Sequence, residues 1–148
     1  MWPALAVVAT LIFASFMQGE FVTAAQSSVT QGQANALATS LVIYGSYAVK
    51  YATANPTVQG SVSDAALGVP YWLVRSPQIG TYVSNGRGYA YYTGARVPSL
   101  AGQVAQATQM AMTVGTVTAG VLVVPQLGAT PSIPIPGQIA NGSVVVTN

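Results

Sequence analysis

The first of the hydrophobic patterns along the chain is an uncharged run over residues 2–17. A helix of this run spans about 24 Å, which is shorter than the ~30 Å hydrocarbon core of a bilayer. Phe21 and Val22 lengthen the apolar segment beyond the run itself. The pattern therefore predicts an N-terminal transmembrane anchor over residues 1–22.

Small residues recur every four positions on one face of this anchor, at Ala6, Thr10 and Ala14. Such a face lets another membrane helix approach closely. A cleaved signal peptide is one alternative, because Ala24 and Ala25 offer small-residue cleavage sites. A prepilin leader is the other, but Gly19 and Glu20 follow the apolar run, whereas such a leader needs them before it. We favour the uncleaved anchor, since no Lys or Arg precedes the apolar run. The long polar remainder of the chain is then expected outside the cytoplasm.

The second pattern predicts an extended amphipathic helix over residues 23–55, in which apolar residues step by four, three, four and three positions. That spacing gives one packing stripe along a helix. Pro56 ends the helix, because proline disfavours helical geometry in Asn55 and cannot donate the next hydrogen bond. The stripe either packs on the chain's own domain or forms a contact with another subunit. Its members are Leu37, Leu41, Tyr44, Ala48 and Tyr51.

Short strands separated by turns form the third pattern, which predicts a small α+β globular domain with an antiparallel sheet over residues 56–148. We expect two short helices and five strands. The helices are capped at Ser63 and Ser99, the first of them ending at Gly68. The strands include a hairpin of Thr81–Ser84 and Tyr89–Tyr92 around Asn85-Gly86, a pair around Thr118–Gly120, and a last strand at Val144–Val146 after a loop over Gln126–Ala140.

The composition of the chain argues against most catalytic and metal-binding functions. Only 4% of residues are charged, with four Lys or Arg, two Asp or Glu, and neither His nor Cys. The chain thus lacks the usual general base, the commonest metal ligand and any thiolate. We expect a protein that is not an enzyme, with no catalytic, cofactor-binding or metal-binding residues. Four dispersed cations make no basic patch, so nucleic acid is not an expected partner.

Aromatic residues are frequent in the predicted domain and invite a binding interpretation. They could stack on sugars, which keeps a secreted aromatic-rich binding module as an alternative function. We instead expect them in the hairpin and the core. The residues in question are Tyr71, Trp72, Tyr82, Tyr89, Tyr91 and Tyr92.

Several segments together resemble the PilM family of type IVb (thin) pilus systems. They are an N-terminal apolar anchor, "LVIYGSYAVKYATANP", "GSVSDAALGVPYWL", "TYVSNGRGYAYY" and a final apolar strand after "GQIANGSVVV". The resemblance implies an inner-membrane component of the pilus biogenesis apparatus, with pilins or other pilus-assembly proteins as partners. It implies no enzymatic residues. The layout is also similar to type IV pilins and minor pilins.

We therefore expect a non-enzymatic assembly component, anchored in the bacterial inner membrane, with its C-terminal domain in the periplasm. It would act by protein–protein contact in type IVb (thin or conjugative) pilus biogenesis and could form a homo-oligomer. A pilin-like subunit of the filament itself is the main alternative.

Overall fold

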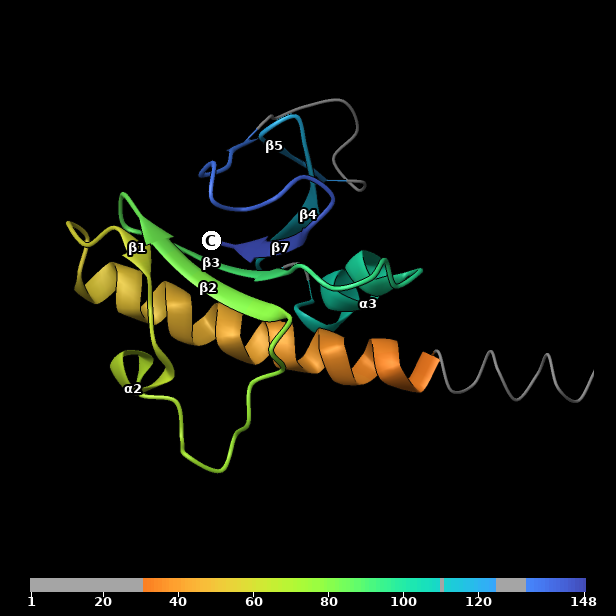
Figure 1. Cartoon of the computed structure of the whole chain (residues 1–148), viewed down its shortest axis with the longest axis horizontal. Coiled ribbons are helices and arrows are strands. Elements are labelled where there is room, and N and C mark those ends of the chain that lie inside the picture. Colours follow the sequence, from red (N-terminus) through yellow and green to blue (C-terminus); the bar gives the residue numbers. More distant parts are fainter. Residues whose placement is uncertain (1–30, 110, 125–132) are drawn as a thin grey trace, which may run out of the picture. The chain divides into compact units, whose positions relative to one another are not determined.

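The chain has an α+β fold, described by a computed structural model for residues 31–109, 111–124 and 133–148. A long helix over residues 31–54 precedes a sheet of seven strands and two short helices in this part of the chain (Figure 1). The short helices are α2 (Asp64–Leu67) and α3 (Leu100–Ala107). The strands are β1 (Gly60–Ser61), β2 (Ile79–Ser84), β3 (Arg87–Tyr92), β4 (Thr113–Thr118), β5 (Val121–Val123), β6 (Ile133–Pro134) and β7 (Val144–Thr147).

All neighbouring strands pair antiparallel, in the order β1-β2-β3-β7-β4-β5-β6. The predicted hairpin is confirmed as β2–β3, with Tyr82 opposite Tyr89. Its turn residues Asn85 and Gly86 have φ angles of 51° and 73°, as a tight two-residue hairpin requires. The last strand, β7, lies between β3 and β4 and joins the two halves of the sheet.

The long helix packs on one face of the sheet through very small residues. Gly45 lies where an added Cβ would be 3.1 Å from Val146 Cγ1 of β7. A Cβ on Gly88 of β3 would overlap the backbone carbonyl of Ala48. Glycine at these positions therefore lets the helix backbone lie directly on β3 and β7.

Two hydrophobic cores lie on the two faces of the sheet. The core beneath the long helix includes Leu41 and Val104, each fully buried. The opposite core is built from Val117 and Leu122 of the β4–β5 pair and Ile139 of the segment before β7. The central strands are thus covered on both sides, which is consistent with the three consecutive valines, Val144–Val146, of β7.

Several local predictions are confirmed. The long helix ends at residue 54, just before Asn55-Pro56. Ser63 caps α2, because its Oγ accepts a hydrogen bond from Ala66 N at 3.3 Å. Gly68 ends the same helix in the left-handed conformation, with φ 73°.

Other predictions are wrong in detail. The sheet has two further strands, β1 and β6, each of two residues, and β6 falls inside the expected loop Gln126–Ala140. Strands this short carry no alternation that a sequence pattern could detect. Ser99 precedes α3 but does not cap it: its φ is 62° and its hydroxyl donates to Pro98 O at 2.6 Å.

The predicted anchor, residues 1–22 with Ala6, Thr10 and Ala14, lies outside the described residues, as does the start of the amphipathic helix up to residue 30. Within residues 31–109, 111–124 and 133–148, no helix combines the length and hydropathy of a membrane span.

Candidate functional site

The segment between α2 and β2 forms a loop that projects away from the long helix (Figure 1). We call residues 69–77 the aromatic loop. Its tip presents Tyr71, Trp72 and Val74, which are 98%, 68% and 86% exposed. Single exposed apolar side chains are ordinary, but three within four consecutive residues form a contiguous patch of the kind that marks an interaction surface.

The base of the loop is tied to the buried face of the long helix. The hydroxyl of Tyr44, whose side chain is fully buried, donates a hydrogen bond to Leu73 O at 3.3 Å. Leu73 N in turn donates to Pro70 O at 3.0 Å and closes a turn. Pro70 and Pro77 further restrict the backbone on either side of the tip. The exposed residues are therefore carried by a braced loop.

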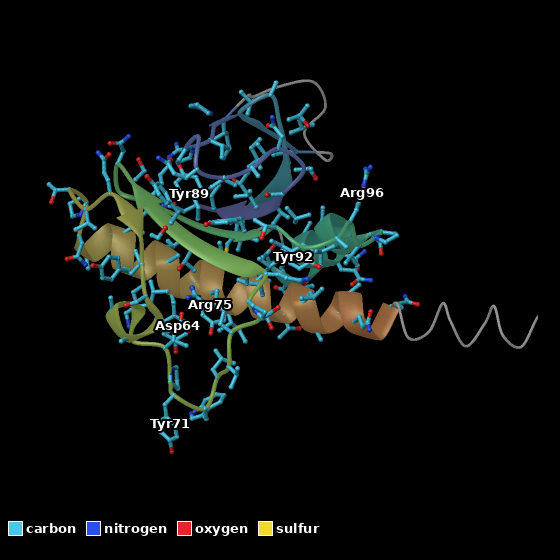
Figure 2. All side chains as sticks on the ribbon, in the orientation of Figure 1. Asp64, Tyr71, Arg75, Tyr89, Tyr92 and Arg96 are labelled. Carbon is cyan, nitrogen blue, oxygen red and sulfur yellow. The ribbon has the colours of Figure 1, made fainter. Side chains whose placement is uncertain are left out.

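Arg75 provides the second support for the loop. Its Nη1 lies 3.3 Å from Asp64 Oδ1 of α2 and donates to Thr81 Oγ1 of β2 at 3.2 Å. Its guanidinium also lies 5.8 Å from the centre of the Tyr44 ring, within cation–π range. Figure 2 shows Asp64 and Arg75 side by side near the long helix, while Tyr71 points away at the tip. Because Asp64 balances the charge of Arg75, the tip itself is uncharged.

The Tyr44 phenol is held in its protonated, donating form. Burial raises the pKa of Tyr44 above its ordinary value, and the negative charge of Asp64 raises it further, against an opposing effect of Arg75. Tyr44 is consequently neutral at physiological pH, and its hydrogen bond to Leu73 persists there.

The predicted stripe residues lie on the inner side of the long helix. Leu41, Tyr44 and Ala48 are fully buried, whereas Leu37 and Tyr51 are partly buried against the same core. Counting back along the stripe also gives Ala34, which is buried. Sequence reasoning missed the other small residues that complete this buried side, which are Ala38, Gly45 and Ala52. Ala38, Gly45 and Ala52 recur every seven positions, a helical spacing that carries little information because small residues are common in many environments.

The expectation that the aromatics lie in the hairpin and core is correct for four residues and wrong for two. Tyr89 and Tyr92 are buried, and Tyr82 and Tyr91 pack against the second core. Tyr71 and Trp72 are exposed instead, because the aromatic loop leaves the sheet between α2 and β2. Their flanking prolines were the signal that separates them from the strand aromatics.

The support of the aromatic loop brings together the Asp64 carboxylate, the Arg75 guanidinium and the Tyr44 phenol. Asp64 and Arg75 form an ion pair, and the Tyr44 hydroxyl donates to Leu73 O. Among residues 31–109, 111–124 and 133–148, no three His, Cys, Asp or Glu side chains group as a metal site requires. What the loop offers to another molecule is apolar and aromatic surface, and burial of that surface is a source of binding free energy.

The fold and the loop define a small α+β domain that presents a braced, uncharged apolar loop. The family model for PilM matches residues 8–147, and the chain therefore belongs to the PilM family, a pilus-related family. A protein PilM from Escherichia coli B7A, known from its crystal structure, has a similar fold, with a TM-score of 0.62 and 19% identity over 80% of this chain and 93% of that chain. A pilM protein from Pseudomonas aeruginosa 2192 is 35% identical over 77% of this chain and 92% of its own, with a TM-score of 0.47. No functionally curated protein matches the sequence.

Proposed function

We propose that this PilM-family protein is a non-enzymatic assembly component of a type IVb pilus biogenesis apparatus and acts by protein–protein contact through the aromatic loop. The observation that carries the proposal is the contiguous exposure of Tyr71, Trp72 and Val74 on a loop that Tyr44 and Arg75 brace. A braced apolar tip loses little conformational entropy when it docks, which favours binding to a shaped protein surface. Membership of a pilus-related family makes other pilus-assembly proteins or pilins the expected partners.

The contact role is tested by replacing Trp72 with serine and counting pili in cells that lack the native protein. Buried aromatic anchors contribute about 2 kcal/mol or more to an interface, so Trp72→Ser should strongly reduce piliation. Val123→Ser is the matched control, because Val123 is 48% exposed on β5, away from the loop. Both variants should accumulate and melt like the wild type. Wild-type piliation with Trp72→Ser would refute the role of the loop.

We also propose that residues 1–22 anchor the protein in the inner membrane and that the domain lies in the periplasm. The uncharged run over residues 2–17 supports the anchor. The full chain should fractionate with the inner membrane and resist carbonate extraction, whereas a chain that begins at Gln26 should be released. Recovery of the full chain in the soluble fraction would contradict the anchor.

The non-enzymatic role is tested at Asp64, the carboxylate beside the loop. Asp64→Asn removes an acid or base but keeps the shape of the side chain. The ion pair with Arg75 is partly exposed, and such pairs contribute about 0–1 kcal/mol, so piliation should remain. Complete loss of pili with an unchanged melting temperature would indicate a chemical function for this carboxylate.

A further inference from the structure

An open apolar groove of about 470 Å³ lies between the long helix and α3. We call it the Met112 groove. Val42, Val49 and Lys50 line it from the helix, and Ala107, Ala111 and Met112 line it from the end of α3 and the segment that follows. Its lining is apolar apart from small hydroxyl groups and the single cation of Lys50.

The groove and the aromatic loop lie on opposite flanks of the long helix. Successive residues of a helix are rotated by about 100°, which places Val42 and Val49 roughly 150° around the helix from Tyr44. Tyr44 braces the aromatic loop, and Val42 and Val49 line the groove. In Figure 1 the loop projects on one side of the helix and α3 lies on the other. One copy of the chain can therefore present its loop while its groove stays open.

We propose that the aromatic loop of one copy docks into the Met112 groove of a second copy. The inference deepens the proposed function and rests on its assignment of the loop as a contact surface, since it names the partner of that loop. The two surfaces are complementary in chemistry. The Lys50 ammonium is attracted to the faces of Tyr71 and Trp72, and the Met112 thioether favours aromatic neighbours. Arg75 does not repel Lys50, because Asp64 balances its charge.

A second copy fits the loop better than a bilayer does. A bilayer has no fixed shape, so it cannot select the one conformation in which Tyr44 and Arg75 hold the tip. A protein groove does gain from this preorganisation. The loop also contains no cation free to attract anionic lipid headgroups, because its Arg75 is paired with Asp64.

The size of the contact predicts a weak association. Aromatic side chains bury about 150–250 Å² each, so the two aromatic side chains of the loop contribute roughly 400 Å² at most. Even an equal area on the groove side would leave the contact below the 1,200–2,000 Å² of stable complexes. Confinement of the copies to one membrane would raise their effective concentration and strengthen the contact. Because loop and groove are different surfaces, the contact runs head to tail and extends unless the copies close into a ring.

The test uses the full chain and its lack of cysteine, which leaves only introduced thiols reactive. Val74→Cys marks the loop, and Ser46→Cys marks the exposed rim of the groove. The two purified variants are mixed and treated with a short bismaleimide crosslinker. We expect a crosslinked dimer in the mixture and none above background in either variant alone. A chain that carries both cysteines should give a ladder of higher oligomers.

Variants at the contact distinguish docking from random collision. Trp72→Ser in the Val74→Cys chain should reduce the mixed dimer to background, and so should Ala111→Glu in the Ser46→Cys chain. Ala111 is exposed, so the glutamate does not disturb the core. The control is Val123→Cys in place of Val74→Cys, which should give no dimer. A mixed dimer that survives both docking variants, or a loop-to-loop dimer of Val74→Cys alone, would overturn the inference.

The crosslinking experiment and the piliation experiment can give independent results. Absence of the mixed dimer, with piliation still lost in Trp72→Ser, overturns self-docking and leaves the loop as a contact for a different protein. Presence of the mixed dimer, with wild-type piliation in Trp72→Ser, supports self-docking and refutes its role in pilus assembly.

Discussion

A single methyl group on Gly88 should disrupt the contact between the long helix and the sheet. A Cβ at this position would overlap the carbonyl carbon and oxygen of Ala48, which are backbone atoms and cannot rotate aside. The helix would have to move by on the order of 1 Å to restore van der Waals distance. Overpacking of this kind costs about 1–3 kcal/mol, and we expect Gly88→Ala near the upper end because the neighbour is rigid.

The assay is thermal unfolding of the purified full chain followed by circular dichroism. A loss of 1 kcal/mol lowers the melting temperature by roughly 3–5 °C for a chain of this length, so Gly88→Ala should melt about 10 °C lower. Gly102→Ala is the matched control: Gly102 lies in α3 with no atom within 4 Å of an added Cβ, and alanine there should stabilise by about 0.5–1 kcal/mol. An unchanged melting temperature for Gly88→Ala would refute the direct helix–strand contact.

Two further predictions concern the buried side of the long helix. Leu41→Ala should lower the free energy of unfolding by about 2–5 kcal/mol at every protein concentration, because Leu41 is fully buried within the chain's own core. An unchanged melting temperature, with weaker self-association, would instead place the stripe at a subunit contact. Tyr44→Phe should lower the free energy of unfolding by about 1 kcal/mol at pH 7, because it removes the hydrogen bond to Leu73 O; denaturant unfolding measures this change. Burial raises the pKa of both Tyr44 and Tyr89 above the ordinary value of about 10. The stability that the two neutral phenols contribute is therefore complete below about pH 10 and is lost as the pH rises through their folded-state pKa values. Between pH 8 and pH 11, the free energy of unfolding should fall less in Tyr44→Phe than in the wild type. An equal fall in both proteins would contradict the raised pKa of Tyr44.

Features set by neighbouring residues were predictable from the sequence. Pro56 and Asn55 end the long helix, and Asn85-Gly86 forms the hairpin turn, because proline and glycine act within a few bonds. Leu41 and Tyr44 were identifiable as one helix face, since large apolar residues at helical spacing have few other uses. Ala38 and Gly45 on the same buried side were not, because such small residues are common in many environments.

Features that depend on residues distant in sequence were not predictable from local patterns. The exposure of Tyr71 and Trp72 depends on Tyr44, Asp64 and Arg75, which support the loop from three different segments. The flanking prolines Pro70 and Pro77 mark the segment as a loop, but no local pattern shows that its aromatic side chains are exposed. The Met112 groove likewise requires the long helix and α3 to lie together, which sequence spacing does not reveal. Membership of the PilM family, in contrast, was recognisable from the combined segments.

The position of β7 has a consequence for biosynthesis. β3 and β4 do not pair with each other, and β7, the last strand in sequence of those described, is hydrogen-bonded to both. While the chain is being synthesised, the two halves of the sheet therefore remain unjoined until residues 144–147 have emerged. A nascent chain that has not reached Val145 and Val146 lacks the strand that both cores share. The domain consequently closes only when β7 pairs with both halves of the sheet.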